Sequence, residues 1–319
     1  MTRIGTSDLD VFPLALGGNV FGWTADRDES FAILDAFRAG GGDFVDTADS
    51  YSAWVDGHTG GESETIIGEW MASRGLRPGE DVIVATKVSQ HPQFRGLAAD
   101  TVRAAAEASR KRLGVETIDL YFAHFDDADT PLEETVAAFG QLVADGVVRH
   151  TAVSNYSADR IREWVRIARE LGVAEPVAVQ PHYNLVHREV ESDILPAARE
   201  FGLGVVPYFS LAKGFLTGKY RSTDVEGHDS PRAKGASTYA TPQGLLILDT
   251  LERISKAHGV SMASVALAWL RAKPGIVAPI ASASRVAQVP DLLDGARLEL
   301  SHDDVADLDS VSEWTPTDM

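Results

Sequence analysis

Phe44-Val45-Asp46-Thr47-Ala48-Asp49-Ser50-Tyr51 is a short apolar run that ends in an acid and is followed by a tyrosine five positions later. Such a run predicts a buried strand that delivers polar side chains into a loop. Two later runs end in the same way, because residues 81–87 finish in Lys87 and residues 118–124 finish in His124. Three successive predicted strands therefore end in Asp, Lys and His, with Tyr51 just beyond the first.

Short runs of this kind alternate along the chain with segments whose apolar residues repeat about every 3.6 positions. The predicted helical segments are Ala98–Leu113, Leu132–Val143, Ala158–Leu171 and Ala263–Leu270. The predicted strands are Leu14–Leu16, Phe44–Asp46, Val82–Thr86, Ile118–Ala123, Thr151–Ser154, Val177–Gln180, Gly204–Pro207 and Ile276–Pro279.

Eight strand-then-helix units without a break in composition predict a single (β/α)8 barrel domain over residues 1–319. The competing fold is a doubly wound sheet. Against it, the first strand is followed by Leu16-Gly17-Gly18-Asn19-Val20 and not by the G-x-G-x-x-G of dinucleotide-binding sheets. A barrel carries its function at the carboxyl ends of its strands, where Asp46, Lys87 and His124 fall.

Two segments stand outside this alternation. Arg3-Ile4 and Leu9-Asp10-Val11 flank a Gly-Thr-Ser-Asp turn, which predicts an N-terminal β-hairpin at the opposite end of the barrel. Residues 211–242 are rich in glycine and proline and poor in apolar residues, so they predict a long loop after the seventh strand. We expect this loop to be mobile without cofactor and to close over a bound one.

Composition limits the classes of function. The chain has 319 residues, of which 44% are hydrophobic and 24% charged, and it contains no cysteine. Disulfides, thiolate metal sites and cysteine nucleophiles are therefore excluded. The net charge of −18 argues against nucleic acid or an anionic membrane as a partner. With no apolar leader and no run long enough to span a membrane, the sequence predicts a cytoplasmic protein.

Asp46, Tyr51, Lys87 and His124 together suit the delivery of a proton to a carbonyl oxygen. An ammonium beside Tyr51 favours the phenolate, and a carboxylate keeps that ammonium charged and oriented. A histidine can add a hydrogen bond to the substrate oxygen. Because none of these groups transfers hydride, a reduction also requires a cofactor.

In these residues the chain resembles the aldo-keto reductases, and the resemblance covers nearly its whole length. In that family Asp, Tyr, Lys and His form a catalytic tetrad, so the resemblance implies that Asp46, Tyr51, Lys87 and His124 are catalytic. The fifth strand ends in Ala152-Val153-Ser154-Asn155-Tyr156, which also resembles the family. There the resemblance implies that Ser154 and Asn155, joined by Gln180, hold the carboxamide of a nicotinamide.

The segment from Pro207 to Tyr220 resembles the part of the family that often reads Tyr-Ser-Pro-Leu-Ala, with Phe209 in place of the serine. The resemblance implies that Tyr208 stacks on the nicotinamide and that the segment after it approaches the pyrophosphate. The cofactor contacts implied there are Phe209, Ser210, Leu211, Lys213, Gly214 and Lys219.

Residues 281–288 resemble the family's motif for the adenosine phosphate. The resemblance implies contacts from Ser284 and Gln288, with Asp291 where a glutamate is usual and Leu292 where an asparagine is usual. Arg285 lies in the same loop, and a guanidinium can hold a 2'-phosphate in a bidentate way. The sequence therefore predicts NADP(H) rather than NAD(H) as cofactor.

Four aromatic residues lie in loops that are expected to border the pocket and to contact substrate: Trp23, Trp54, Phe125 and Tyr156. The histidines at positions 58, 91, 182 and 187 do not have the spacing of a metal-binding motif, so we expect no metal. The sequence does not predict the oligomeric state.

Three functions remain open from the sequence. The first is an NADP-dependent reductase of an aldehyde, ketone or sugar carbonyl, with a small carbonyl or alcohol as its partner. The second is a cofactor-binding regulatory subunit, because the segments around Tyr208 and Ser284 also resemble the potassium-channel β subunits within the family. The third is a barrel hydrolase or isomerase that uses Asp46 with Asp49 or Glu62, which leaves Lys87 and His124 without a role.

Overall fold

The computed structural model describes residues 1–224 and 230–313. Its centre is an eight-stranded sheet within this part of the chain, in the order β11-β10-β9-β8-β5-β4-β3-β12, with every pair parallel. The strands are β3 (Ala15–Gly17), β4 (Phe44–Asp46), β5 (Ile83–Val88), β8 (Ile118–Ala123), β9 (Val148–Ser154), β10 (Ala178–Gln180), β11 (Gly204–Val205) and β12 (Ile280–Ala281).

The sheet closes on itself through the segment that leads into β12. Val205 in β11 forms a parallel bridge with Ile276, and the amide of Val277 donates to the carbonyl of Val205 at 2.9 Å. On its other side β12 pairs with β3. The chain is thus a (β/α)8 barrel, as the alternation of its sequence predicts.

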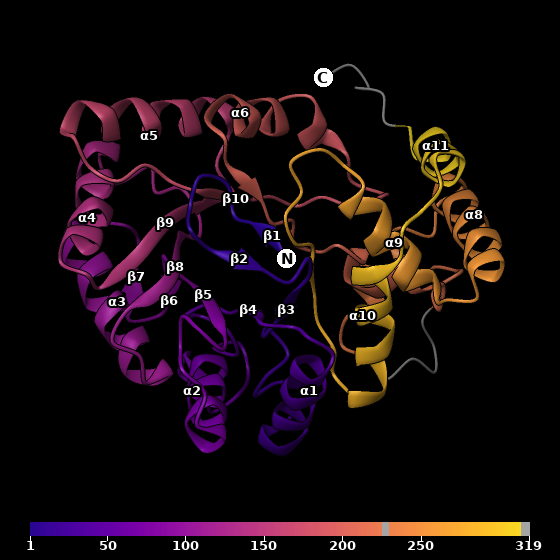
Figure 1. Cartoon of the computed structure of the whole chain (residues 1–319), viewed down its shortest axis with the longest axis horizontal. Helices are drawn as coiled ribbons and strands as arrows, with labels where there is room; N and C mark the ends of the chain where they lie inside the picture. The colour runs from indigo at the N-terminus through magenta and orange to yellow at the C-terminus, as the bar shows by residue number, and fades with distance from the viewer. Residues whose placement is uncertain (225–229, 314–319) are drawn as a thin grey trace.

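Helices follow the strands and surround them (Figure 1). They bury apolar residues against the sheet or against neighbouring helices, and many end in a left-handed glycine cap, such as Gly172 with a φ of 66° after α5. They are α1 (Arg27–Ala39), α2 (Glu62–Arg74), α3 (Ala99–Leu113), α4 (Leu132–Ala144), α5 (Ala158–Leu171), α6 (Ile194–Phe201), α8 (Pro242–His258), α9 (Met262–Arg271), α10 (Val289–Arg297) and α11 (His302–Val311).

The N-terminal hairpin covers one end of the barrel, and Figure 1 shows it in front of the strands. Its strands β1 (Thr2–Arg3) and β2 (Asp10–Val11) are antiparallel. Between them, Ile4 and Leu9 are buried in the cluster that fills the barrel interior, together with Phe44 of β4. The hairpin therefore closes the end opposite to the predicted site.

Two elements differ from the prediction. The eighth strand lies at Ile280–Ala281 and not at Ile276–Pro279. Residues 276–279 instead bridge β11 and β3, because Pro279 has no amide to donate and offers only its carbonyl, to Ala15. The segment after β11 is not a plain loop, because it contains the 3₁₀ helix η2 (Ala212–Thr217) and the short helix α7 (Ala233–Ser237).

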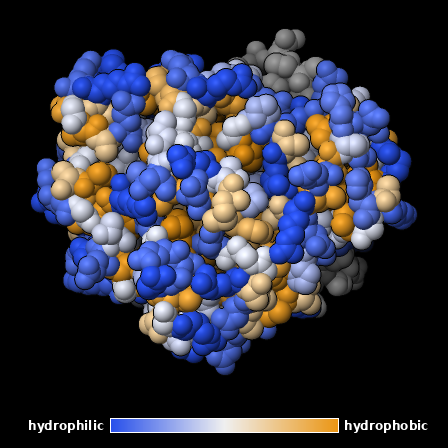
Figure 2. Space-filling model, in the orientation of Figure 1, coloured by the Kyte–Doolittle hydropathy of each residue, from blue (hydrophilic) through white to orange (hydrophobic). Residues whose placement is uncertain are grey.

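The smaller elements are a second hairpin, β6 (Gln90–His91) with β7 (Phe94–Arg95), and the 3₁₀ turns η1 (Glu189–Glu191) and η3 (Val286–Gln288). Figure 2 shows hydrophilic residues over most of the hairpin face, with hydrophobic residues between them in small spots. Of the helices within residues 1–224 and 230–313, none combines the length and the apolar composition that crossing a membrane requires.

Candidate active site

The ammonium group of Lys87 is the centre of a buried polar cluster at the carboxyl ends of β4 and β5. Its Nζ lies 2.8 Å from a carboxylate oxygen of Asp46 and donates to the carbonyl of Thr47 at 2.6 Å. The same Nζ lies 3.2 Å from the hydroxyl of Tyr51. Lys87 and Asp46 are both buried, and a lysine keeps its charge there because it has these partners.

Burial raises the pKa of Tyr51, and the charge of Lys87 partly offsets this effect. Burial alone would lower the pKa of Lys87, but Asp46 and Tyr51 outweigh it, so the pKa of Lys87 is raised. At neutral pH the cluster thus holds a charged lysine beside a protonated tyrosine. The proton of Tyr51 is available for transfer, and a cation is in place to stabilise the phenolate that remains.

His124 follows β8, and its ring lies edge to face with Tyr51, with 6.1 Å between the ring centroids. Burial, and then the charge of Lys87, hold the pKa of His124 well below its usual value. The ring is therefore a neutral imidazole, which can donate one hydrogen bond. The structure brings Asp46, Lys87, Tyr51 and His124 together from three separate strand ends.

A chain of hydrogen bonds extends this cluster across the next strands. Gln180 in β10 donates its Nε2 to the second carboxylate oxygen of Asp46 at 2.8 Å, and Ser154 in β9 donates its hydroxyl to the Gln180 carbonyl at 2.9 Å. The side-chain amide of Asn155 donates to the Ser154 hydroxyl at 3.0 Å. The hydroxyl of Tyr208 donates to Oδ1 of Asn155 at 2.7 Å. The four predicted nicotinamide contacts thus form one chain with Asp46.

The backbone turns sharply after Tyr208. Phe209, Ala212 and Lys213 have φ values of 52°, 47° and 58°, in the left-handed region that side chains other than glycine rarely adopt. Gly214 continues the turn with a φ of 97°. The predicted contact Ser210 uses its hydroxyl within the protein, because it donates to the carbonyl of Pro207 at 3.0 Å.

Two cations border this turn. Nζ of Lys213 lies 5.3 Å from the centre of the Phe209 ring, and Nζ of Lys219 lies 5.1 Å from that of Tyr220. The carbonyl of Leu211 accepts the amide of Gly214 at 2.8 Å, which closes a turn that contains Lys213. The side chain of Lys219 lies against Gly214, so these predicted pyrophosphate contacts are neighbours.

The predicted adenosine-phosphate contacts surround η3, beyond β12. The amides of Ser284 and Arg285 both donate to Oε1 of Gln288, at 2.8 and 3.2 Å, while the Arg285 side chain is exposed. Asp291 is exposed on α10. Leu292, in the position of the usual asparagine, is buried in the core and faces the barrel instead of a ligand.

Three of the four predicted rim aromatics border the polar cluster. The ring centroids of Trp23 and Trp54 are 5.5 Å apart, and those of Trp54 and Tyr51 are 6.2 Å apart. Phe125 lies beside His124 at 4.9 Å. Trp54 and Phe125 are 52% and 40% exposed, so their faces are free to contact a substrate.

Tyr156 differs from the other three aromatic residues, because it is buried and only 2% exposed. Its ring packs edge to face on Trp164 of α5, with centroids 5.6 Å apart. An apolar partner on the following helix thus draws this loop residue into the core.

Two charged residues lie near the cluster: Arg232, to which the sequence analysis gave no role, and Asp49, which it named only for the hydrolase alternative. The guanidinium of Arg232 lies over the ring of Trp23 at 5.4 Å and forms no ion pair within residues 1–224 and 230–313. Both carboxylate oxygens of Asp49 are buried without a hydrogen-bond partner among the same residues. Burial, and then Glu64, raise the pKa of Asp49 well above its usual value. Arg232 belongs to no recognisable motif, so the sequence carries no signal for it.

A (β/α)8 barrel with polar side chains gathered at the carboxyl ends of its strands is the architecture of many enzymes. A model of the Aldo/keto reductase family matches residues 13–313. The chain therefore belongs to the aldo/keto reductase family, whose members are oxidoreductases that generally use nicotinamide cofactors.

Three relatives illustrate the range of the family. The chain is 33% identical over 298 residues to a probable voltage-gated potassium channel subunit beta of Oryza sativa subsp. japonica. The aligned region covers 90% of this chain and 88% of that relative. It is 34% identical over 307 residues to the uncharacterized oxidoreductase YrpG of Bacillus subtilis (94% and 91%). It is 29% identical over 330 residues to norsolorinic acid reductase B of Aspergillus parasiticus (97% and 83%).

Proposed function

We propose that this protein is an NADP(H)-dependent reductase that converts an aldehyde, ketone or sugar carbonyl to an alcohol, with Tyr51 as the general acid. The observation that carries the proposal is the double contact of the Lys87 ammonium with the Asp46 carboxylate and the Tyr51 hydroxyl. A buried phenol next to a fixed cation is an acid whose conjugate base is stabilised in advance.

Each side chain has a distinct role in this mechanism. Tyr51 transfers its proton to the carbonyl oxygen, and Lys87 stabilises the phenolate that results. Asp46 keeps Lys87 charged and aimed at Tyr51. His124, as a neutral imidazole, donates a hydrogen bond to the substrate oxygen and orients it. A nicotinamide nucleotide, when bound, supplies the hydride that no side chain carries.

The residues present fit such a nucleotide. Tyr208 offers a flat ring, and the left-handed turn after it resembles the backbone concavities that bind anions. Lys213, Lys219 and Arg232 gather near that turn, although the whole chain carries a net charge of −18. Local cations in an acidic protein favour an anionic ligand at this place.

The choice of NADP(H) over NAD(H) rests on the exposed guanidinium of Arg285, next to the predicted adenosine site. Titration of both nucleotides by quenching of tryptophan fluorescence tests it. We expect NADP(H) to bind more tightly, and Arg285→Ala to remove most of that preference. Equal affinities in the native protein contradict this choice without touching the role of Tyr51.

A cofactor-binding regulatory subunit is the second candidate, favoured by the similarity to the probable potassium channel subunit. A barrel hydrolase has less support, because Asp49 is buried with its pKa raised well above the usual value, and the Glu62 carboxylate caps the amides of Thr59 and Gly60. Steady turnover separates the first two candidates.

The decisive experiment is a panel of aldehydes, ketones and sugar carbonyls, assayed with reduced NADP and NAD. We expect sustained oxidation of the nucleotide with some of these carbonyls, and a fall of ~10²-fold or more in Tyr51→Phe with little change in nucleotide affinity. Tight nucleotide binding without turnover on any carbonyl would favour the regulatory subunit instead.

A further inference from the structure

Two histidine rings stack behind the ring of Tyr208, and the mechanism above does not use them. The rings of His182 and His187 are parallel, with centroids 3.7 Å apart and planes 13° apart. On its other side His182 stacks on Tyr208, with 5.4 Å between centroids and 20° between planes. The order of the stack is therefore His187, His182 and Tyr208, with Tyr208 at its end.

Asn184 fixes this stack. Its Oδ1 accepts the amide of Val186 at 2.9 Å, and its Nδ2 donates to the carbonyl of Phe209 at 2.9 Å, so the orientation of the amide group is determined. The same Nδ2 lies 3.2 Å from Nε2 of His182. The backbones of Asn184 and His187 exchange two hydrogen bonds of 3.1 Å, which fold the chain back and bring His187 onto His182.

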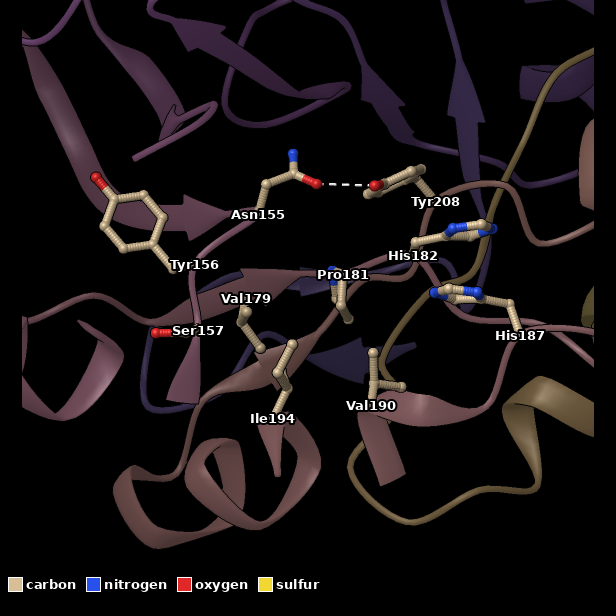
Figure 3. A pocket seen from close by; sticks show the side chains of 10 residues that line it. All are labelled: Asn155, Tyr156, Ser157, Val179, Pro181, His182, His187, Val190, Ile194 and Tyr208. Carbon is tan, nitrogen blue, oxygen red and sulfur yellow. Dashed lines mark hydrogen bonds between the residues drawn. The ribbon is translucent and has the colours of Figure 1, made fainter. Parts of the chain in front are cut away.

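A cavity of about 390 Å³ adjoins Tyr208 and the stack (Figure 3). Val179, Val190 and Ile194 line it on the side away from the hydrogen bond between Asn155 and Tyr208. The Tyr208 ring is open on the side of this cavity. On its other sides it contacts His182 at its face, Phe209 edge to face at 5.1 Å, and Asn155 at its hydroxyl.

Both histidines are neutral, which makes them suitable as stacking partners. Burial, and then the neighbouring side chains of His187 and Lys213, lower the pKa of His182 to about 3. Burial also lowers the pKa of His187. The stack therefore adds no cation of its own behind Tyr208, and it offers only flat aromatic faces.

We propose that His182, backed by His187 and fixed by Asn184, is a positioning residue that holds the Tyr208 ring ready to receive a nicotinamide ring. This inference rests on the proposed function, because it assumes that Tyr208 is the surface on which the nicotinamide stacks. His182 itself then acts through Tyr208 and does not touch the cofactor.

The test compares two ligands that differ only in the nicotinamide: oxidised NADP and 2'-phospho-ADP-ribose, or NAD and ADP-ribose if the protein prefers NAD. In the native protein we expect the dinucleotide to bind more tightly than the fragment. His182→Asn keeps a hydrogen-bonding group but removes the ring, and we expect it to weaken the dinucleotide about three- to tenfold without changing the fragment. His182→Phe keeps a ring and should retain most of the affinity.

His258→Asn is the matched control, because His258 lies on α8 and bonds to Asp304 at 2.9 Å, far from Tyr208 in the sequence and on another element. It should leave both affinities unchanged. Equal loss of dinucleotide and fragment in His182→Asn, unchanged affinities in that variant, or a His182→Phe protein as weak as His182→Asn would each overturn the inference. A native protein that binds neither ligand contradicts the proposed function itself, whereas one that binds both equally contradicts only the role of the Tyr208 platform.

Discussion

Lys87 is the residue with which Asp46 and Tyr51 both interact, so the three are expected to act as one unit. Lys87→Met removes the ammonium, leaves the Asp46 carboxylate buried without its partner, and takes away the stabilisation of the phenolate. We expect Lys87→Met and Tyr51→Phe each to lose most of the turnover. The double variant should lose about as much as the worse single variant, because groups that act together are not additive.

Steady-state kinetics of the two single variants and the double variant on one carbonyl measure this coupling. Losses that add in the double variant would mean that Lys87 and Tyr51 contribute independently. His124→Ala is a useful comparison, because a group that orients the carbonyl is expected to raise KM as well as to lower kcat.

Asp119 gives the free energy of unfolding a defined dependence on pH. Burial raises the pKa of Asp119 to about 6, although its carboxylate accepts the amide of Val84 at 2.9 Å. Between the usual carboxyl pKa and this value, the folded protein keeps a proton that the unfolded chain releases, so stability falls as the pH rises from about 4 to about 6. This difference in pKa corresponds to roughly 3 kcal/mol in the free energy of unfolding. The native protein should lose that amount over this pH range, and Asp119→Asn should not.

Urea denaturation of the native protein and of Asp119→Asn across that range of pH is the measurement. The exposed Asp303, replaced by Asn, serves as the control and should follow the native protein. A constant difference between native protein and Asp119→Asn from pH ~4 to ~7 would show that the carboxyl is ionised in the fold throughout.

The residues at the strand ends were predictable because the geometry of a parallel barrel brings the carboxyl ends of its strands together. Asp46, Lys87 and His124 are far apart in sequence, yet each follows its own apolar run. Arg232 was not predictable, since its segment has no periodicity and its place over Trp23 depends on how two loops meet. The burial of Tyr156 depends on Trp164, a contact that only the packing of α5 reveals.

At the scale of elements, the segment between β11 and α8 is bonded to the rest of the protein at some residues and exposed to solvent at others. Arg221 joins it to α8 through Asp249 and Glu252, both at 2.7 Å. Lys234 in α7 is exposed, and its neighbour Gly235 lies against the side chain of Lys213. The segment is therefore fixed at points that flank the predicted pyrophosphate site.

If this segment covers a bound nucleotide, then trypsin should cut after Lys234 more slowly once NADP is present. Nicotinamide mononucleotide, which lacks the pyrophosphate, is the control ligand and should protect little. From the sequence we expect cleavage between Gly227 and Gly235 in the protein without nucleotide. Residues 227–229 lie outside the described residues, so Lys234 is the informative position. The same rate of cleavage at Lys234 with saturating NADP would rule out a covering role.

At the scale of the whole molecule, the N-terminal hairpin contributes stability at the end remote from the site. Ile4 is fully buried in the interior cluster, and Asp8 bonds to Arg149 and His150, each at 2.7 Å. Ile4→Ala should lower the free energy of unfolding by about 2–5 kcal/mol, because it removes buried methyl groups from the barrel. Nucleotide affinity should stay the same at temperatures where the variant is folded.

Arg3→Ala is the matched control, because the Arg3–Asp10 ion pair is exposed and contributes little to stability. Denaturation in urea and fluorescence titration of nucleotide separate the two effects. A loss of nucleotide affinity in Ile4→Ala at temperatures where the variant is folded would mean that the hairpin end and the site are coupled.

A chain of hydrogen bonds runs from Tyr208 through Asn155, Ser154 and Gln180 to Asp46. This chain limits protein engineering, because a change in one of these residues disturbs the contacts of the others. Asn155 also donates to the carbonyl of His124 at 2.9 Å, so a change at Asn155 affects contacts to both Tyr208 and His124. The aromatic side chains of Trp23, Trp54 and Phe125 stand outside this chain. If the proposed mechanism holds, libraries that vary those three positions can therefore change the substrate pocket while these hydrogen bonds stay in place.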